Sequence, residues 1–372
     1  MKFVKILLFL LFASVVSLSA QYDISYKLLK SYDRVFYNTN NPVMDLKVYN
    51  NDNYEKCADE ISCRVLKDSG EPVYFFNQSF TIAPGDSAQL SFSFQVPVGF
   101  YKVILEKEDS VITQACMGYE PEQIKSLPDS NFSFSDYWEG ILLEMRATPM
   151  TPQLTKMKIK GGKLRNIYSV KVNSIGGGCV EGYLAVPKGK GVYPVVITCT
   201  DKNELLFMPD PNSREEFIDF VISPRKGEMF KEYYYRTLCI DVVRAIDYVV
   251  TRLDVDLKNI FLQGCGRGGA FVLAASALDR RVTAVAVYAP GLMNESVTDE
   301  LKPYDIKNLS GRIEAPVIMG VGLEDEKCRP RENFSIYNLI NSNKQYYIFV
   351  EGHTPPALWG DLAHNFFMKY LR

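Results

Sequence analysis

The sequence predicts an α/β protein with a mostly parallel sheet covered by helices on both faces, preceded by a smaller all-β domain. From about residue 168 onward, short apolar runs alternate with stretches of helical spacing, which is typical of a doubly wound sheet. Before residue 118, apolar and polar residues alternate with the two-residue period of half-buried strands. Within the second region, a glycine cluster in 259–277 joins an apolar run to an alanine-rich run, which indicates a sharp strand-to-helix turn.

Residues 21–117 are predicted to form an immunoglobulin-like sandwich of about seven strands. The run 90–94 alternates apolar residues with serine, as a strand with one buried face requires. Turn signals separate the strands at 68–70, 83–86 and 97–99. No catalytic constellation appears in this region. We therefore interpret it as a spacer or docking module, with a dedicated carbohydrate-binding role as the alternative.

Composition and the first residues indicate an exported globular protein. The 372 residues are 47% hydrophobic and 23% charged, which suits two domains with real cores. The net charge of −2 does not favour nucleic acid or an anionic membrane as a partner. Residues 1–20 carry a lysine-bearing start, an apolar run and a small-residue exit, the three parts of an export signal. The apolar run is shorter than the roughly 18 residues that a membrane span needs. We expect a periplasmic or extracellular protein without a membrane span.

Eight cysteines in an exported chain raise the question of disulfides. Cys57 and Cys63 are the pair that we expect if any pair forms. Cys199, Cys239 and Cys265 lie inside strand or helix patterns, where a free thiol behaves as a small apolar residue. The chain contains no C-x-x-C pair and no cluster of histidine and cysteine, so neither a structural metal nor another cofactor is predicted.

The α/β domain is predicted to span 134–372, after a proline-containing linker at 118–133. Its first helix begins near Ser135, with Ser135 or Asp136 as its cap. Further helices are expected from 233, at 332–340 and from 358, and an irregular polar stretch at 201–227. Strands are expected at 168–172, 180–186, 194–198, 260–262, 282–288, 317–321 and 346–350.

The glycine cluster has the layout of a nucleophile elbow, in which G-x-S-x-G exposes a serine on a sharp turn. Glycines flank the tip because the strand and the helix come too close there for a Cβ atom. Here the pattern reads Gly264-Cys265-Gly266-Arg267-Gly268. Gly266 stands at the tip, and the backbone N–H of Arg267 is the expected oxyanion donor. The frame of a catalytic site is thus predicted without its attacking oxygen.

The predicted elements follow the α/β-hydrolase order of nucleophile, acid and histidine. Asp325 follows the strand at 317–321, and His353 follows the strand at 346–350. Both therefore lie just past the carboxyl ends of strands, where open α/β sheets place their sites. The chain has only two histidines, and His364 falls within the closing helix. His353 is the candidate base and Asp325 the candidate acid.

From Phe134 to Arg372 the chain resembles the acetyl xylan esterases and cephalosporin C deacetylases. Besides the elbow, the resemblance is carried by Asp136-Tyr137-Trp138, Glu181-Gly182-Tyr183-Leu184-Ala185-Val186-Pro187, Tyr233-Tyr234-Tyr235-Arg236, Asp241-Val242-Val243-Arg244-Ala245, Gly322-Leu323-Glu324-Asp325, Cys328, Pro330, Phe334, Tyr337-Asn338 and Gly352-His353. It implies an exported serine esterase that removes acetyl groups from xylan or small acetylated sugars without a cofactor. It also implies that Asp325 orients His353, which deprotonates the elbow serine.

The chain departs from the pattern of this family in three places. Gly266 replaces the serine. A loop that normally supplies an oxyanion donor reads Cys199-Thr200-Asp201-Lys202-Asn203, and a negative Asp201 has the wrong sign to stabilise an oxyanion. The loops before Tyr233 and after Pro290 are short, which leaves the oligomeric state open.

Three hypotheses follow for function. The first is a degenerate esterase, a pseudoenzyme that binds an acetylated carbohydrate or another small ester, or serves as a scaffold. The second is an active ester hydrolase that uses Cys265, or a water activated by His353 and Asp325. Cys265 lies one residue before the tip, so we expect its thiol to point away from His353. The third is a protein that docks partners through the sandwich.

Overall fold

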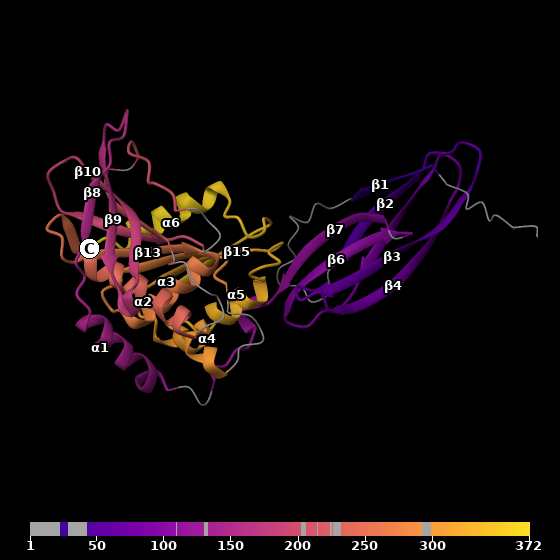
Figure 1. Cartoon of the computed structure of the whole chain (residues 1–372). Helices are drawn as coiled ribbons and strands as arrows, with labels where there is room; N and C mark the ends of the chain where they lie inside the picture. Colours follow the sequence, from indigo (N-terminus) through magenta and orange to yellow (C-terminus); the bar gives the residue numbers. More distant parts are fainter. Residues whose placement is uncertain are drawn as a thin grey trace, which may run out of the picture.

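The computed structural model describes residues 23–28, 43–108, 110–129, 133–201, 206–213, 215–223, 225, 232–291 and 299–372. These residues form an elongated β-sandwich beside an α/β domain (Figure 1). The predicted export signal at 1–20 lies outside the described residues. Within the described ranges, every helix is too short or too polar to cross a lipid bilayer.

The sandwich consists of seven antiparallel strands in two sheets. One sheet has the order β1-β2-β5 and the other β4-β3-β6-β7. Their bounds are β1 Ile24–Leu28, β2 Val43–Asn50, β3 Cys57–Lys67, β4 Pro72–Ile82, β5 Ser87–Ser93, β6 Gly99–Lys107 and β7 Ser110–Tyr119. Leu46 and Phe92 from the first sheet share one buried cluster with Ile61 and Val103 from the second. The two sheets therefore pack face to face, and the predicted seven-strand sandwich is confirmed.

The expected pairing of Cys57 with Cys63 is wrong. Both residues lie on β3, six positions apart, and both thiols are free and buried. Six residues of extended strand span roughly 20 Å, whereas a disulfide needs Cα atoms within about 7 Å of each other. Both side chains belong to the sandwich core. Burial raises the pKa of Cys63 to about 12, so this thiol is a packing group.

Nine strands build the sheet of the α/β domain, in the order β16-β15-β14-β13-β11-β12-β10-β9-β8. The strands from β12 to β16 run parallel along this order, and β8, β9 and β10 form an antiparallel edge that meets β12. Their bounds are β8 Gln153–Lys156, β9 Arg165–Asn173, β10 Cys179–Pro187, β11 Tyr193–Cys199, β12 Ile218–Ser223, β13 Val255–Cys265, β14 Ala284–Tyr288, β15 Val317–Gly322 and β16 Lys344–Phe349.

Helices cover both faces of this sheet, as predicted (Figure 1). Strand alternation sends Val195 and Ile197 to a cluster shared with α1 (Gly140–Ala147), α2 (Glu232–Val249), α3 (Gly266–Leu278) and α5 (Pro330–Tyr337). Val196, between them in the chain, faces the other cluster, which is covered by α6 (Ala357–Lys369). A short α4 (Ile306–Leu309) packs near α3 and α5.

Three local expectations were wrong. The stretch 201–227, expected to be irregular, contains β12, and β8 was not predicted at all. The first helix begins as a π-helical turn at Ser135–Glu139, before α1. At the N-terminal end of this turn, the hydroxyl of Ser133 accepts the backbone N–H of Asp136 at 3.5 Å. Neither of the predicted caps makes a side-chain capping bond.

The sandwich packs directly against the α/β domain. The ring of Phe100 on β6 lies 5.4 Å from that of Phe334 on α5, centroid to centroid. The Asp68 carboxylate accepts the backbone N–H of Arg331 at 2.9 Å. The stretch expected to be a linker is itself packed, because Asn338 donates its amide hydrogens to the carbonyls of Pro121 and Ile124. These contacts hold β6, β7 and α5 in one continuous body.

Phe334→Ala is expected to lower the free energy of unfolding by about 3–5 kcal/mol. The Phe334 ring is fully buried and contacts the rings of Phe100, Tyr337 and Tyr346, so its removal leaves a cavity between the two bodies. Denaturant unfolding measures the change. Leu358→Ala, at a side chain that is 58% exposed, is the control and should change stability by less than about 0.5 kcal/mol. A loss below about 1 kcal/mol for Phe334→Ala would contradict the assigned packing.

Candidate active site

The turn from β13 into α3 has the geometry of a nucleophile elbow. β13 ends at Cys265, and the tip residue Gly266 has a φ of +52°, in the left-handed region. A Cβ on Gly264 would lie 2.6 Å from the carbonyl carbon of Gly268. A Cβ on Gly268 would overlap the carbonyl oxygen of Cys199. The glycines that flank the tip are therefore required by the close approach of strand, helix and β11.

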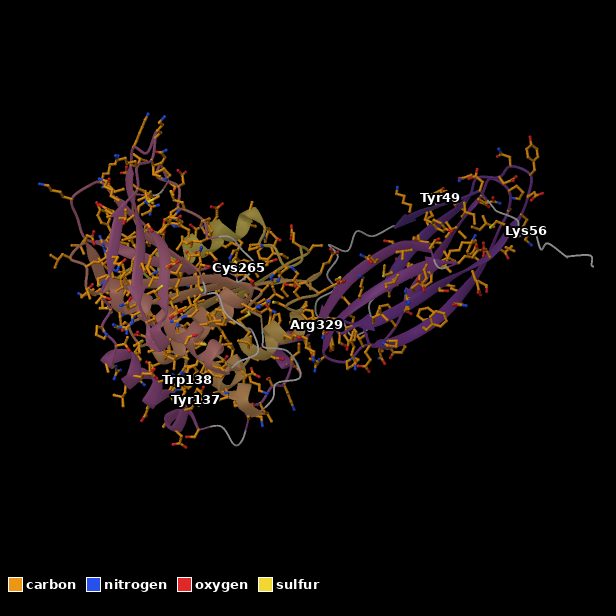
Figure 2. All side chains as sticks on the ribbon, viewed as in Figure 1. Tyr49, Lys56, Tyr137, Trp138, Cys265 and Arg329 are labelled. Atoms are coloured by element: carbon orange, nitrogen blue, oxygen red, sulfur yellow. The ribbon has the colours of Figure 1, made fainter. Side chains whose placement is uncertain are left out.

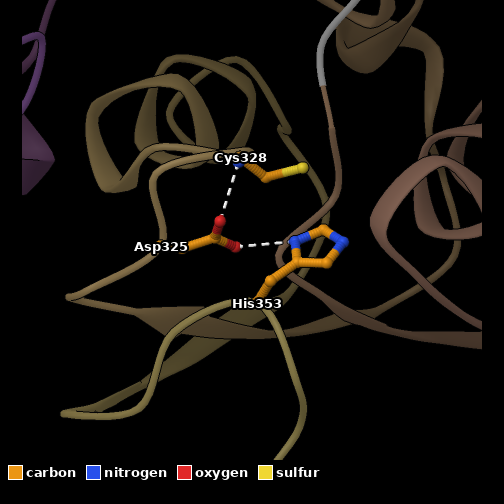
Figure 3. Close-up of side chains that lie close together, drawn as sticks. All are labelled: Asp325, Cys328 and His353. Carbon is orange, nitrogen blue, oxygen red and sulfur yellow. Dashed lines mark hydrogen bonds and ion pairs between the residues drawn. The ribbon is translucent and has the colours of Figure 1, made fainter.

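The predicted acid and base meet at the carboxyl ends of β15 and β16. Asp325 Oδ2 lies 3.0 Å from His353 Nδ1 (Figure 3). The other oxygen, Oδ1, accepts the backbone N–H groups of Lys327 at 2.8 Å and Cys328 at 2.9 Å. The Asp325 side chain is fully buried. Its own loop thus fixes the carboxylate, which in turn fixes the orientation of the imidazole ring.

The side chain of Asp201 fills the position that a nucleophile would take. A Cβ built on Gly266 would overlap Asp201 Oδ2 and lie 3.0 Å from His353 Nε2. The same carboxylate oxygen accepts the backbone N–H of Arg267 at 2.9 Å, so the expected oxyanion donor is already bonded. Asp201 Oδ2 also lies 3.9 Å from His353 Nε2. One buried carboxylate therefore occupies the space of a serine side chain. It also bonds the oxyanion donor and lies beside the base.

His353 is an imidazolium at neutral pH in this arrangement. Its ring lies between the carboxylates of Asp201 and Asp325, and both favour the charged form. The carboxylate of Asp201 is the largest cause, followed by that of Asp325 and then by Cys328, and together they raise the pKa of His353 from 6.5 to about 11. A general base must be unprotonated at the working pH. His353 cannot serve as one while Asp201 stays in place.

The thiol nearest the imidazole belongs to Cys328, which sequence reasoning did not single out as reactive. Its sulfur, a ring nitrogen of His353 and a carboxylate oxygen of Asp325 lie within 4.8 Å of one another (Figure 3). Burial is the largest influence on the Cys328 thiol and raises its pKa above the usual 9.0, although His353 acts in the opposite direction. The thiol therefore stays protonated, whereas the thiolate is the nucleophilic form.

Asp325, Cys328 and His353 are also residue types that can bind a metal ion. In this site the oxygens of Asp325 are already hydrogen-bonded, Oδ1 to two backbone N–H groups and Oδ2 to His353. The protonated imidazole offers no lone pair. The residues present thus fit a charge-paired cluster better than a metal centre.

Two further candidates lie outside this cluster. Cys265 is half-buried and packs against the aromatic cluster on the α6 face, which includes Tyr288 and Trp359. The ring of the half-buried His364 on α6 packs on the core residue Phe217, 5.6 Å away between centroids. The position of Asp201 had a sequence signal. It follows β11, the strand beside the elbow strand, and Cys199 pairs in register with Gly264.

Parts of the chain are similar to known proteins. Residues 225–294 and 293–360 match the family model described as acetyl xylan esterase (AXE1). The chain is 27% identical over 305 residues to the acetyl esterase Axe7A of Xylanibacter ruminicola, with 67% of this chain and 69% of that protein covered.

Two solved structures share the fold of the α/β domain. An acetyl xylan esterase from Paenibacillus sp. R4 superposes with a TM-score of 0.63 at 20% identity, covering 68% of this chain and 99% of that one. Acetyl xylan esterase 1 from Thermoanaerobacterium sp. gives 0.59 at 21% identity, covering 66% and 95%. The predicted α/β-hydrolase fold is confirmed.

Proposed function

Because this chain belongs to the acetyl xylan esterase family, we propose that it is an exported member that binds acetylated carbohydrate without hydrolysing it. The observation that carries the proposal is the Asp201 carboxylate in the place of the nucleophile. Gly266 supplies no attacking atom. Under this proposal the chain keeps the fold of the family and lacks its ester hydrolysis.

Three physical effects oppose ester hydrolysis at this site. Loss of a triad nucleophile alone lowers turnover by about a million-fold. The Arg267 N–H, bonded to Asp201, is not free to stabilise an oxyanion, and the adjacent negative charge would repel one. His353, held as an imidazolium, cannot accept a proton. Two of these effects, the bonded Arg267 N–H and the charged His353, depend on Asp201, whereas the missing nucleophile depends on Gly266.

The second candidate function is an active ester hydrolase with a thiol or a water as nucleophile. The contact of Cys328 with the imidazole favours it, because a thiol beside a histidine is the arrangement of cysteine hydrolases. Cys265 and a water beside His353 are the other possible nucleophiles. A water would need a neutral His353 as base, and Asp201 opposes that state. A thiol would have to ionise, and burial raises the pKa of the Cys328 thiol.

Purified protein is expected to hydrolyse 4-nitrophenyl acetate no faster than a buffer blank from pH 6 to pH 9, as measured by release of 4-nitrophenolate. Cys265→Ala and Cys328→Ala should match the unsubstituted protein, since neither thiol takes part in turnover under the proposal. Saturable turnover that either alanine variant abolishes would favour the hydrolase instead. Turnover that survives in both variants would point to an activated water.

A further inference from the structure

A cavity of about 520 Å³ lies between the sandwich and the α/β domain. The sandwich contributes the turn after β3 and parts of β6 and β7, and the α/β domain contributes the loop that follows β15. Arg329, at the end of that loop, lies at the junction of the two bodies (Figure 2). Cavities of this volume at domain interfaces are common places for small-molecule sites.

The cavity has an apolar floor and a polar rim. Four buried residues of the sandwich line the floor: Phe100, Tyr101, Cys116 and Met117. The rim carries three cationic side chains and three carboxylates, Lys67, Lys102 and Arg329 with Asp68, Glu324 and Glu326. Each domain supplies both cationic and anionic side chains to the rim, so neither domain alone forms the site.

The balance of charges on the rim selects the kind of ligand. An anion would meet the carboxylates and a cation would meet Lys102 and Arg329, so neither sign is favoured. A purely apolar ligand would remove these charged groups from water without replacing their hydrogen bonds, which is costly. A sugar ring offers an apolar C–H face to the floor and hydroxyl groups that donate to carboxylates and accept from ammonium and guanidinium groups. A neutral oligosaccharide fits both parts.

The cavity lies beside the loop that carries the acid of the candidate active site. Asp325 is part of the cavity wall, on the same loop as Glu324 and Glu326. The elbow itself is filled by Asp201. We propose that a neutral oligosaccharide binds in the cavity between the two domains, and not at the elbow. This proposal rests on the carbohydrate-binding function proposed above and gives that function a site.

Isothermal titration calorimetry with acetylated and unacetylated xylo-oligosaccharides tests the proposal on the full chain. Lys102→Ala removes a half-buried rim cation on β6, and Gln114→Trp places a large side chain at an exposed position of the cavity wall on β7. Each is expected to weaken binding at least ten-fold. Lys47→Ala, at a half-buried lysine on β2 of the other sheet, is the matched control and should bind as the unsubstituted protein does. Thermal unfolding of each variant checks that it folds.

The outcomes separate the site from the function. Sugar binding that survives both Lys102→Ala and Gln114→Trp would overturn the proposed site and leave the carbohydrate-binding function standing. Lack of heat from the unsubstituted protein with every sugar would contradict the function itself. Loss of binding in folded Lys102→Ala and Gln114→Trp, with Lys47→Ala unchanged, is the result that supports the site.

Discussion

The double variant Asp201→Ala/Gly266→Ser is expected to hydrolyse 4-nitrophenyl acetate, whereas Gly266→Ser alone is expected to stay inactive. A serine at position 266 would overlap Asp201 Oδ2, so the single variant strains the turn while the carboxylate keeps its bond to the Arg267 N–H. Removing the carboxylate frees the space, the Arg267 N–H and the Nε2 of His353 together. Elbow serines adopt a strained backbone of the kind that Gly266 already has, with a φ of +52°.

The expected size of this effect follows from the parts that are restored. A working triad contributes up to about a million-fold to turnover, and one missing oxyanion donor costs about 10²–10³-fold. The double variant should therefore exceed Gly266→Ser by about a thousand-fold or more in kcat/KM. Asp201→Ala alone is the control and should stay inactive, because it has no nucleophile. Equal activity in Gly266→Ser and the double variant would mean that Asp201 does not block the site.

The second large effect concerns the protonation of His353. Both ring nitrogens are expected to carry protons through pH 9, because the ring lies between two carboxylates that raise its pKa to about 11. In Asp201→Ala the largest cause of the shift is gone, so the pKa should fall from about 11 toward the ordinary 6.5. Long-range ¹H–¹⁵N correlation spectra of the two histidine rings report the protonation state directly. His364, on α6, provides the internal reference.

This shift also sets a pH dependence of stability. The pKa of His353 is higher in the folded chain than in the unfolded one, so its protonation stabilises the fold fully below about pH 6.5. That contribution declines as the pH rises from 6.5 to about 11. The unsubstituted protein should therefore lose stability with rising pH more steeply than Asp201→Ala in this window. A neutral imidazole at pH 8 in the unsubstituted protein would contradict the charge pairing.

Much of the fold could be predicted because the burial of a strand shows in the apolar residues along it. Val195, Val196 and Ile197 form a continuous apolar run, as a strand buried on both faces must, and the run is β11. The strand β12 escaped prediction because Asp219 interrupts its apolar residues inside a polar stretch. The Asp219 carboxylate pairs with the buried Arg165, a partner 54 positions away that local periodicity does not reveal.

Part of the candidate site could be predicted from the sequence and part could not. Asp325 and His353 could be predicted, since each directly follows a strand whose carboxyl end must lie at the shared edge of the sheet. The position of the Asp201 side chain at the elbow depends on the path of the chain after β11 and on the lack of a side chain at Gly266. The contact of Cys328 with the imidazole depends on the turn that follows β15, where the Asp325 carboxylate accepts the backbone N–H of Cys328. Such placements follow from tertiary packing, which spacing in the sequence does not specify.

A high-resolution crystal structure of the unsubstituted protein tests most directly whether Asp201 takes the place of the missing nucleophile. We expect an Asp201 carboxylate oxygen within about 3 Å of the Arg267 nitrogen and in contact with the His353 ring. An Asp201 side chain turned away from the elbow, with a water bound to the Arg267 N–H in its place, would contradict it.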